Sequence, residues 1–140
     1  MKYRECELIG GWYNRCIMVE LNDFEQLVDE AIAELPAYFR ERMDNLAIMV
    51  EEWPDQVTMQ LAGIHHPSQL LGFYHGIPLT NRNQSYALVP PDKISIYRQP
   101  ILLQCRNGQE IRAMTQRVVR HEVAHYFGID DDRLHEIGAY

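Results

Sequence analysis

Cysteine is scarce in this sequence and never occurs as a CxxC pair. The three cysteines, Cys6, Cys16 and Cys105, are an odd number, which favours reduced thiols over a disulfide framework. No apolar run reaches the length needed to cross a membrane, and the stretch MKYRECELIGGWYNRC has acidic and polar residues where a signal peptide has apolar ones. We therefore expect a cytoplasmic protein without a membrane partner.

Positive charge is also limited. The chain has 13 Lys and Arg against 20 Asp and Glu, which gives a formal net charge of −7. Proteins that bind nucleic acid gain most of their affinity by neutralising phosphates, so we do not expect nucleic acid as a partner. The 140 residues, 46% of them hydrophobic, are sufficient for one core. We expect a single domain over residues 1–140, with residues 1–16 as an N-terminal extension.

The spacing of apolar residues predicts an α+β fold. Steps of three and four residues predict a first helix over 24–35, with Asn22 or Asp23 as its N-cap. Alternating or continuous apolar residues predict three strands, at 45–53, 70–75 and 93–98. Further helical segments are expected at 38–43, 100–105, 109–127 and after 130–132, whereas 55–68 has no clear pattern. Helices and strands do not alternate regularly, which favours α+β over α/β.

The segment HEVAHYFG, at 121–128, carries the chemistry. His121 and His125 are four residues apart, so on a helix their imidazoles project from the same face and can bind one ion. Glu122 follows the first histidine and lies beside that ion without ligating it, where it can deprotonate a water molecule. We predict a Zn²⁺ site in which Glu122 is the catalytic residue.

This segment resembles the zinc motifs of two known families. HEVAHYFGIDD, at 121–131, resembles the extended zinc motif of the metzincin proteases, with aspartate in place of the third histidine. The residues after Gly128 contain no methionine for the Met-containing turn of that group, so we do not expect a full metzincin. The longer string through residue 138 resembles a family of small bacterial zincin-like metallopeptidases. GFYHGIPLT, at 72–80, and PDKISIYRQPIL, at 91–102, are similar to that family as well.

The resemblance to the small zincin-like family covers most of residues 17–140. It implies a minimal zincin fold: a small mixed or antiparallel sheet, a backing helix, an active-site helix and a short C-terminal helix. It also suggests that the strand Lys93–Arg98 lies along the cleft, where a peptide would add as an extra strand.

The third metal ligand has three candidates. Asp131 stands at the metzincin spacing, where Gly128 would turn the chain back toward the ion. Glu136 is the alternative third ligand if the last helix folds back, and His135 is a further option. Carboxylate and imidazole are both acceptable ligands of zinc.

Other polar side chains have less defined roles. Three tyrosines are candidates for stabilising an oxyanion: Tyr97, Tyr126 and Tyr140. Three further histidines are expected to lie in loops rather than to form a second metal site: His65, His66 and His75.

The predicted function is hydrolysis of a peptide or protein substrate by a zinc-dependent metallopeptidase, with Glu122 as the general base. One alternative is a non-catalytic, metal-stabilised interaction module. Another is a metal-dependent endoribonuclease, because a family of small bacterial endoribonucleases has a similar HxxxHxxGxxxH site without the glutamate. Glu122, Asp131 and the negative net charge favour the peptidase.

Overall fold

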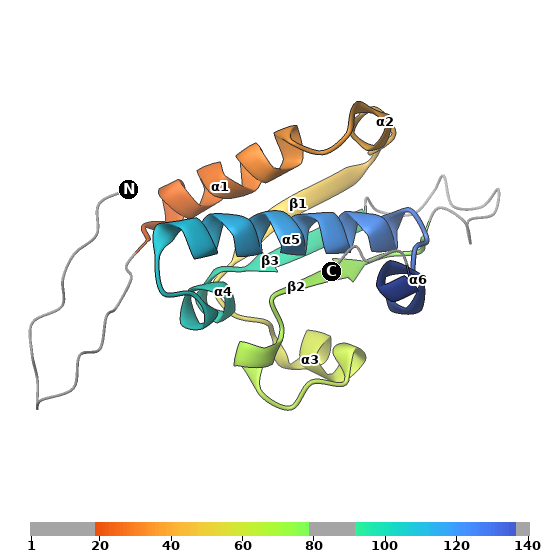
Figure 1. The fold of residues 1–140 in the computed structure, drawn as a ribbon. Coiled ribbons are helices and arrows are strands. Elements are labelled where there is room, and N and C mark those ends of the chain that lie inside the picture. Colours follow the sequence, from red (N-terminus) through yellow and green to blue (C-terminus); the bar gives the residue numbers. More distant parts are fainter. Residues whose placement is uncertain (1–18, 79–91, 137–140) are drawn as a thin grey trace, which may run out of the picture.

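The computed structural model describes residues 19–78 and 92–136. These residues form a small sheet with two long helices on one face (Figure 1). The elements in chain order are α1 (Leu21–Ala33), α2 (Ala37–Arg40), β1 (Leu46–Glu51), α3 (Gln56–Ala62), the 3-10 turn η1 (Pro67–Gln69), β2 (Gly72–His75), β3 (Asp92–Tyr97), α4 (Arg98–Gln104), α5 (Gly108–Tyr126) and α6 (Asp131–Glu136). The α+β class is confirmed. The expected N-terminal extension lies outside the described residues.

Helix α1 is the backing helix. Its apolar stripe is buried as the periodicity predicts, and it lies alongside α5 over the sheet (Figure 1). The predicted N-cap is wrong, because α1 begins at Leu21 and both Asn22 and Asp23 fall inside its first turn. Glu20 occupies the cap position without a capping hydrogen bond from its side chain. Burial of the stripe rather than a capping bond therefore sets this helix in place.

The sheet is mixed, with the strand order β1-β3-β2. Strand β3 runs parallel to β1 and antiparallel to β2. Ile94 and Ile96 of β3 are fully buried and belong to the same core as the apolar residues of α1 and α5. Side chains alternate along a strand, so Ser95 and Tyr97 point to the opposite face.

Helix α5 carries the HExxH segment, and the turn after its C-terminal end brings α6 back toward it. Asn107 caps the start, because its side chain accepts a hydrogen bond from the Glu110 N–H at 2.9 Å. Gly128, with φ of +81°, follows the last turn in the left-handed conformation that glycine adopts readily. The Asp130 side chain then accepts from the Arg133 N–H at 2.9 Å, and burial of Leu134 holds α6 against the rest of the fold.

The segment between β1 and β2, which lacked a clear pattern, contains helix α3. Asp55 caps this helix by accepting from the Thr58 N–H at 2.7 Å, and Gly63 ends it with φ of +67°. Only Thr58 of α3 is buried, while Val57 and Leu61 are 66% and 70% exposed. The helix has only seven residues, and its apolar side chains Val57 and Leu61 do not pack on the core.

No helix among the described residues combines the length and the apolar character that crossing a membrane requires. Cys105 is a buried free thiol, and burial raises its pKa. This agrees with the expectation of a reduced cysteine at this position. The other two cysteines lie outside the described residues.

Candidate active site

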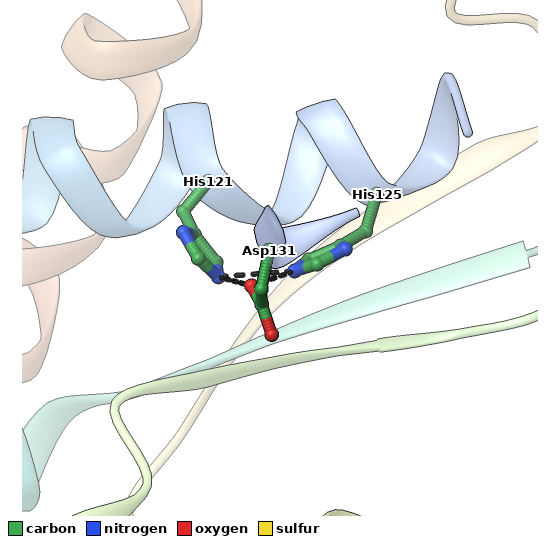
Figure 2. Close-up of side chains that lie close together, drawn as sticks. All are labelled: His121, His125 and Asp131. Atoms are coloured by element: carbon green, nitrogen blue, oxygen red, sulfur yellow. Dashed lines mark hydrogen bonds and ion pairs between the residues drawn. The ribbon is translucent and has the colours of Figure 1, made fainter. Parts of the chain in front are cut away.

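Three of the predicted ligand residues meet at the C-terminal end of α5. Figure 2 shows the rings of His121 and His125 projecting from α5 toward the carboxylate of Asp131, which α6 supplies. The Asp131 Oδ1 lies 3.0 Å from the His121 Nε2 and 3.2 Å from the His125 Nε2. The two Nε2 atoms are 3.0 Å apart. The three atoms thus form a nearly equilateral triangle.

The dimensions of this triangle fit zinc. Zinc–nitrogen and zinc–oxygen bonds of about 2.0–2.2 Å place neighbouring corners of a tetrahedral site about 3.3 Å apart. Three protein atoms at such spacing occupy three corners and leave the fourth for a water or substrate. Burial, followed by the charge of His125, lowers the pKa of His121 against the opposing effect of Asp131. The neutral imidazole that this favours is the form that binds a metal.

The other two candidates for the third ligand are not in this group. Among residues 19–78 and 92–136, the only cluster with metal-ligand spacing consists of His121, His125 and Asp131. The Glu136 carboxylate instead accepts a hydrogen bond from Arg133 at 2.9 Å, and its side chain is 66% exposed. His135 is also exposed and outside the cluster. The geometry therefore favours Asp131, the residue at the metzincin spacing.

Glu122 lies next to the cluster and is buried, with only 7% of its surface exposed. Burial, and secondarily the negative charge of Asp131, raises the pKa of Glu122 to about 8. The main-chain N–H of Tyr74 donates to its carboxylate and acts in the opposite direction. A divalent cation at the cluster would also favour the carboxylate, since opposite charge lowers the pKa of an acid.

A cleft of about 650 Å³ opens over these four residues. Its walls come from four parts of the chain, which are the end of α3, strand β2, helix α5 and the segment that leads into α6. The lining residues are Ala62, Ile64, Leu70, Gly72, Phe73, Tyr74, Gly76, Pro78, His121, Glu122, His125, Gly128, Ile129, Asp130 and Asp131. The lining thus combines apolar side chains with the acidic and imidazole groups of the cluster.

The strand beside the cleft is β2, and the assignment of Lys93–Arg98 to that position is wrong. Those residues form β3, which lies in the middle of the sheet with β1 on one side and β2 on the other. Both of its edges are paired, so β3 cannot accept an added strand. Arg98 begins α4 instead of extending the strand. Among the described strands, β2 presents an outer edge at the cleft.

Of the three predicted oxyanion donors, the structure describes Tyr97 and Tyr126, and neither lines the cleft. Tyr97 is 1% exposed on the opposite face of the sheet; burial raises its pKa, and its hydroxyl bonds with Ser95 and Thr58. Tyr126 is also 1% exposed, and its hydroxyl donates to the Asp44 carbonyl at 2.8 Å. Both residues thus have structural roles. Tyr140 lies outside the described residues.

Tyr126→Phe tests this structural role. Loss of the hydroxyl leaves the Asp44 carbonyl without this donor, so we expect the free energy of unfolding to fall by about 1 kcal/mol. Peptidase activity should not change. Chemical denaturation and a turnover assay measure the two effects separately. A loss of turnover without a loss of stability would instead assign the hydroxyl to the cleft.

Two of the remaining histidines lie in loops as predicted, and one does not. His65 and His66 precede η1, where the His66 ring lies 2.6 Å from the Ser68 hydroxyl. His75 is the last residue of β2, and its Nε2 lies 3.2 Å from the Ser95 hydroxyl. Within the described part of the chain, no ligand cluster includes any of the three.

Sequence reasoning missed the contribution of β2 to the site. Gly72 and Tyr74 line the cleft; the Tyr74 main chain bonds Glu122, and a Cβ atom at Gly72 would lie only 3.1 Å from the Glu122 Cγ. A main-chain contact leaves no pattern of side-chain types to detect. The available signal was GFYHG itself, where glycines at both ends of a short strand indicate a close approach of another element.

A helix that presents two histidines and a glutamate to a cleft beside a small sheet defines this protein as zincin-like in architecture. The family model of zincin-like metallopeptidases matches residues 43–139, more than half of the chain, and the chain belongs to this family. No curated protein matches the chain. Membership implies a metal, typically zinc, and supports peptidase activity. The matched region begins after α1 and contains the sheet, the cleft and the cluster.

Proposed function

We propose that this protein is a zinc-dependent peptidase in which His121, His125 and Asp131 hold the metal and Glu122 is the general base. One observation carries the proposal: three ligand atoms from α5 and α6 converge at 3.0–3.2 Å beside a buried carboxyl group that lines the same cleft. An ion pair at the surface needs only one imidazole beside a carboxylate, whereas a metal site needs several ligand atoms that converge on one point.

The chain's own residues supply the proton transfers of the reaction. When bound, zinc acts as a Lewis acid that polarises the scissile carbonyl and makes a water molecule more acidic. Glu122 takes a proton from the attacking water on a carboxylate oxygen while the bond between water oxygen and carbonyl carbon forms. It then delivers that proton to the amide nitrogen as the carbon–nitrogen bond breaks. Its buried position keeps bulk water away from the transferred proton.

The shape and charge of the cleft favour a peptide over RNA. A peptide can lie in the cleft beside β2, where its side chains can contact the apolar residues Ile64, Leu70 and Phe73. Among the described residues that line the cleft there is no lysine or arginine to neutralise phosphates. This supports the peptidase over the endoribonuclease alternative.

Metal removal tests the proposal. We expect the zinc-loaded protein to cleave members of a peptide library, with the new termini identified by mass spectrometry. A chelator should abolish cleavage, and added zinc should restore it, because the base alone lacks the Lewis acid. Cleavage that a chelator does not affect would contradict the proposal. Zinc-dependent cleavage of RNA without cleavage of peptide would support the endoribonuclease, and zinc binding without either activity would support the interaction module.

A further inference from the structure

The outer edge of β2 turns main-chain groups toward α5. Tyr97 of β3 donates its N–H to the Leu71 carbonyl at 2.9 Å, immediately before β2 begins. Bonded and non-bonded positions alternate along an antiparallel pair. The N–H groups of Gly72 and Tyr74 therefore point away from β3, on the side where α5 passes.

The Tyr74 N–H, which points toward α5, donates a hydrogen bond to the Glu122 carboxylate. Tyr74 is itself fixed at its other end, where its hydroxyl donates to Asp92 at 2.6 Å. Asp92 is only 3% exposed and belongs to the central strand. The general base is thus held by an edge strand that is tied to the middle of the sheet.

Gly72 sets how closely α5 approaches this strand. A Cβ atom at Gly72 would lie 2.7 Å from the Val118 Cγ1 and 3.1 Å from the Glu122 Cγ. Val118 and Glu122 are one helical turn apart, so both lie on the face of α5 that meets β2. The Ser95 carbonyl of β3 would be 3.2 Å away, so the strand has little room to shift in that direction. A side chain at position 72 is therefore expected to push α5 away from β2.

We propose that Gly72 is a positioning residue for Glu122: its missing side chain lets α5 approach β2 closely enough for the Tyr74 N–H to hold the carboxylate beside the metal ligands. The geometric part of this inference concerns residues 72, 74 and 122 alone. The consequence for catalysis rests on the proposed function. The three atoms nearest to a Cβ at position 72 belong to Val118, Glu122 and Ser95, and none belongs to His121 or His125. We therefore expect the metal site to survive substitution of Gly72.

Hydrogen exchange of the Tyr74 amide, followed by NMR on the full chain, measures the positioning directly. Glu122→Ala removes the acceptor and should speed this exchange about tenfold, the change that accompanies the loss of one net hydrogen bond. Gly72→Ala should have a similar effect while zinc stays bound. Under the proposed function, Gly72→Ala should also lower kcat at unchanged zinc stoichiometry.

Val118→Ala provides the matched control, because Val118 Cγ1 is the atom that an alanine at position 72 would meet first. In the double variant Gly72→Ala/Val118→Ala, we expect Tyr74 exchange and kcat to return toward the values of Val118→Ala alone. The rescue separates crowding of α5 from a general loss of stability, which a second large-to-small substitution in the core would make worse.

The outcomes distinguish this inference from the proposed function. If Tyr74 exchange does not respond to Glu122→Ala or to Gly72→Ala, or if Val118→Ala does not rescue it, the positioning role is wrong whatever the activity. If exchange responds as expected and the zinc-loaded wild type cleaves no peptide, the positioning stands and the proposed function fails.

Discussion

Glu122→Gln is expected to lower kcat for peptide hydrolysis by roughly 10²–10⁴-fold, the range that a positioned general base contributes. Glutamine has the same size and retains a carbonyl oxygen that can accept the Tyr74 N–H. It cannot take a proton from the attacking water. Zinc should stay bound, because Glu122 is not among the three residues whose atoms converge. Turnover and zinc stoichiometry measured on the same preparation check both parts.

Glu25→Gln is a suitable control for this substitution. It changes the net charge by the same amount at an exposed position of α1 and outside the residues that line the cleft. We expect it to leave kcat unchanged. If Glu122→Gln hydrolyses peptides as fast as the wild type, Glu122 is not the base, and the proposed mechanism is wrong even if zinc is required.

Features that depend on local periodicity were predictable. The spacing of His121 and His125 implies a shared helix face, and the structure turns both rings to the same point. The alternating residues of β1 and β3 likewise indicated their strands. The bend after α5 was predictable because glycine is the residue that adopts the left-handed conformation at Gly128 without strain.

Features that depend on contacts distant in sequence were not predictable. The order β1-β3-β2 follows from how strands far apart in the chain pair, so the sequence indicated β3 as a strand but not as the central one. Helix α3 escaped detection because its seven residues are too few to show a clear helical period. The N-cap of α1 was misplaced, since Asn22 and Asp23 have suitable side chains but the helix begins before them.

The same distinction explains why the third ligand was open in the sequence. Asp131, His135 and Glu136 share a short segment, and their residue types all suit zinc. The choice among them depends on the return of the chain after Gly128. Capping by Asp130 and burial of Leu134 start α6 at Asp131, so its first residue, rather than its last, faces the histidines.

Asp131→Ala is therefore expected to weaken zinc binding strongly. Loss of an outer-shell partner of a metal site costs about 10–100-fold in affinity, and loss of a direct ligand should exceed this. His125→Ala should have at least as large an effect, because it removes a nitrogen ligand and leaves Asp131 with a single imidazole. Competition with a coloured zinc chelator measures both affinities. Hydrolysis should fall in parallel with zinc occupancy.

Three further variants separate ligation from other effects of Asp131. Asp132→Ala removes the same charge from the next residue in the first turn of α6, so it reproduces any effect on the helix and should retain zinc. Glu136→Ala should also retain zinc. Asp131→His restores the third histidine of the metzincin spacing and should bind zinc again, since imidazole is an equally acceptable ligand. Full zinc binding by Asp131→Ala together with loss of zinc in Glu136→Ala would instead place the ligand at the end of α6, which would require that helix to turn over when the metal binds.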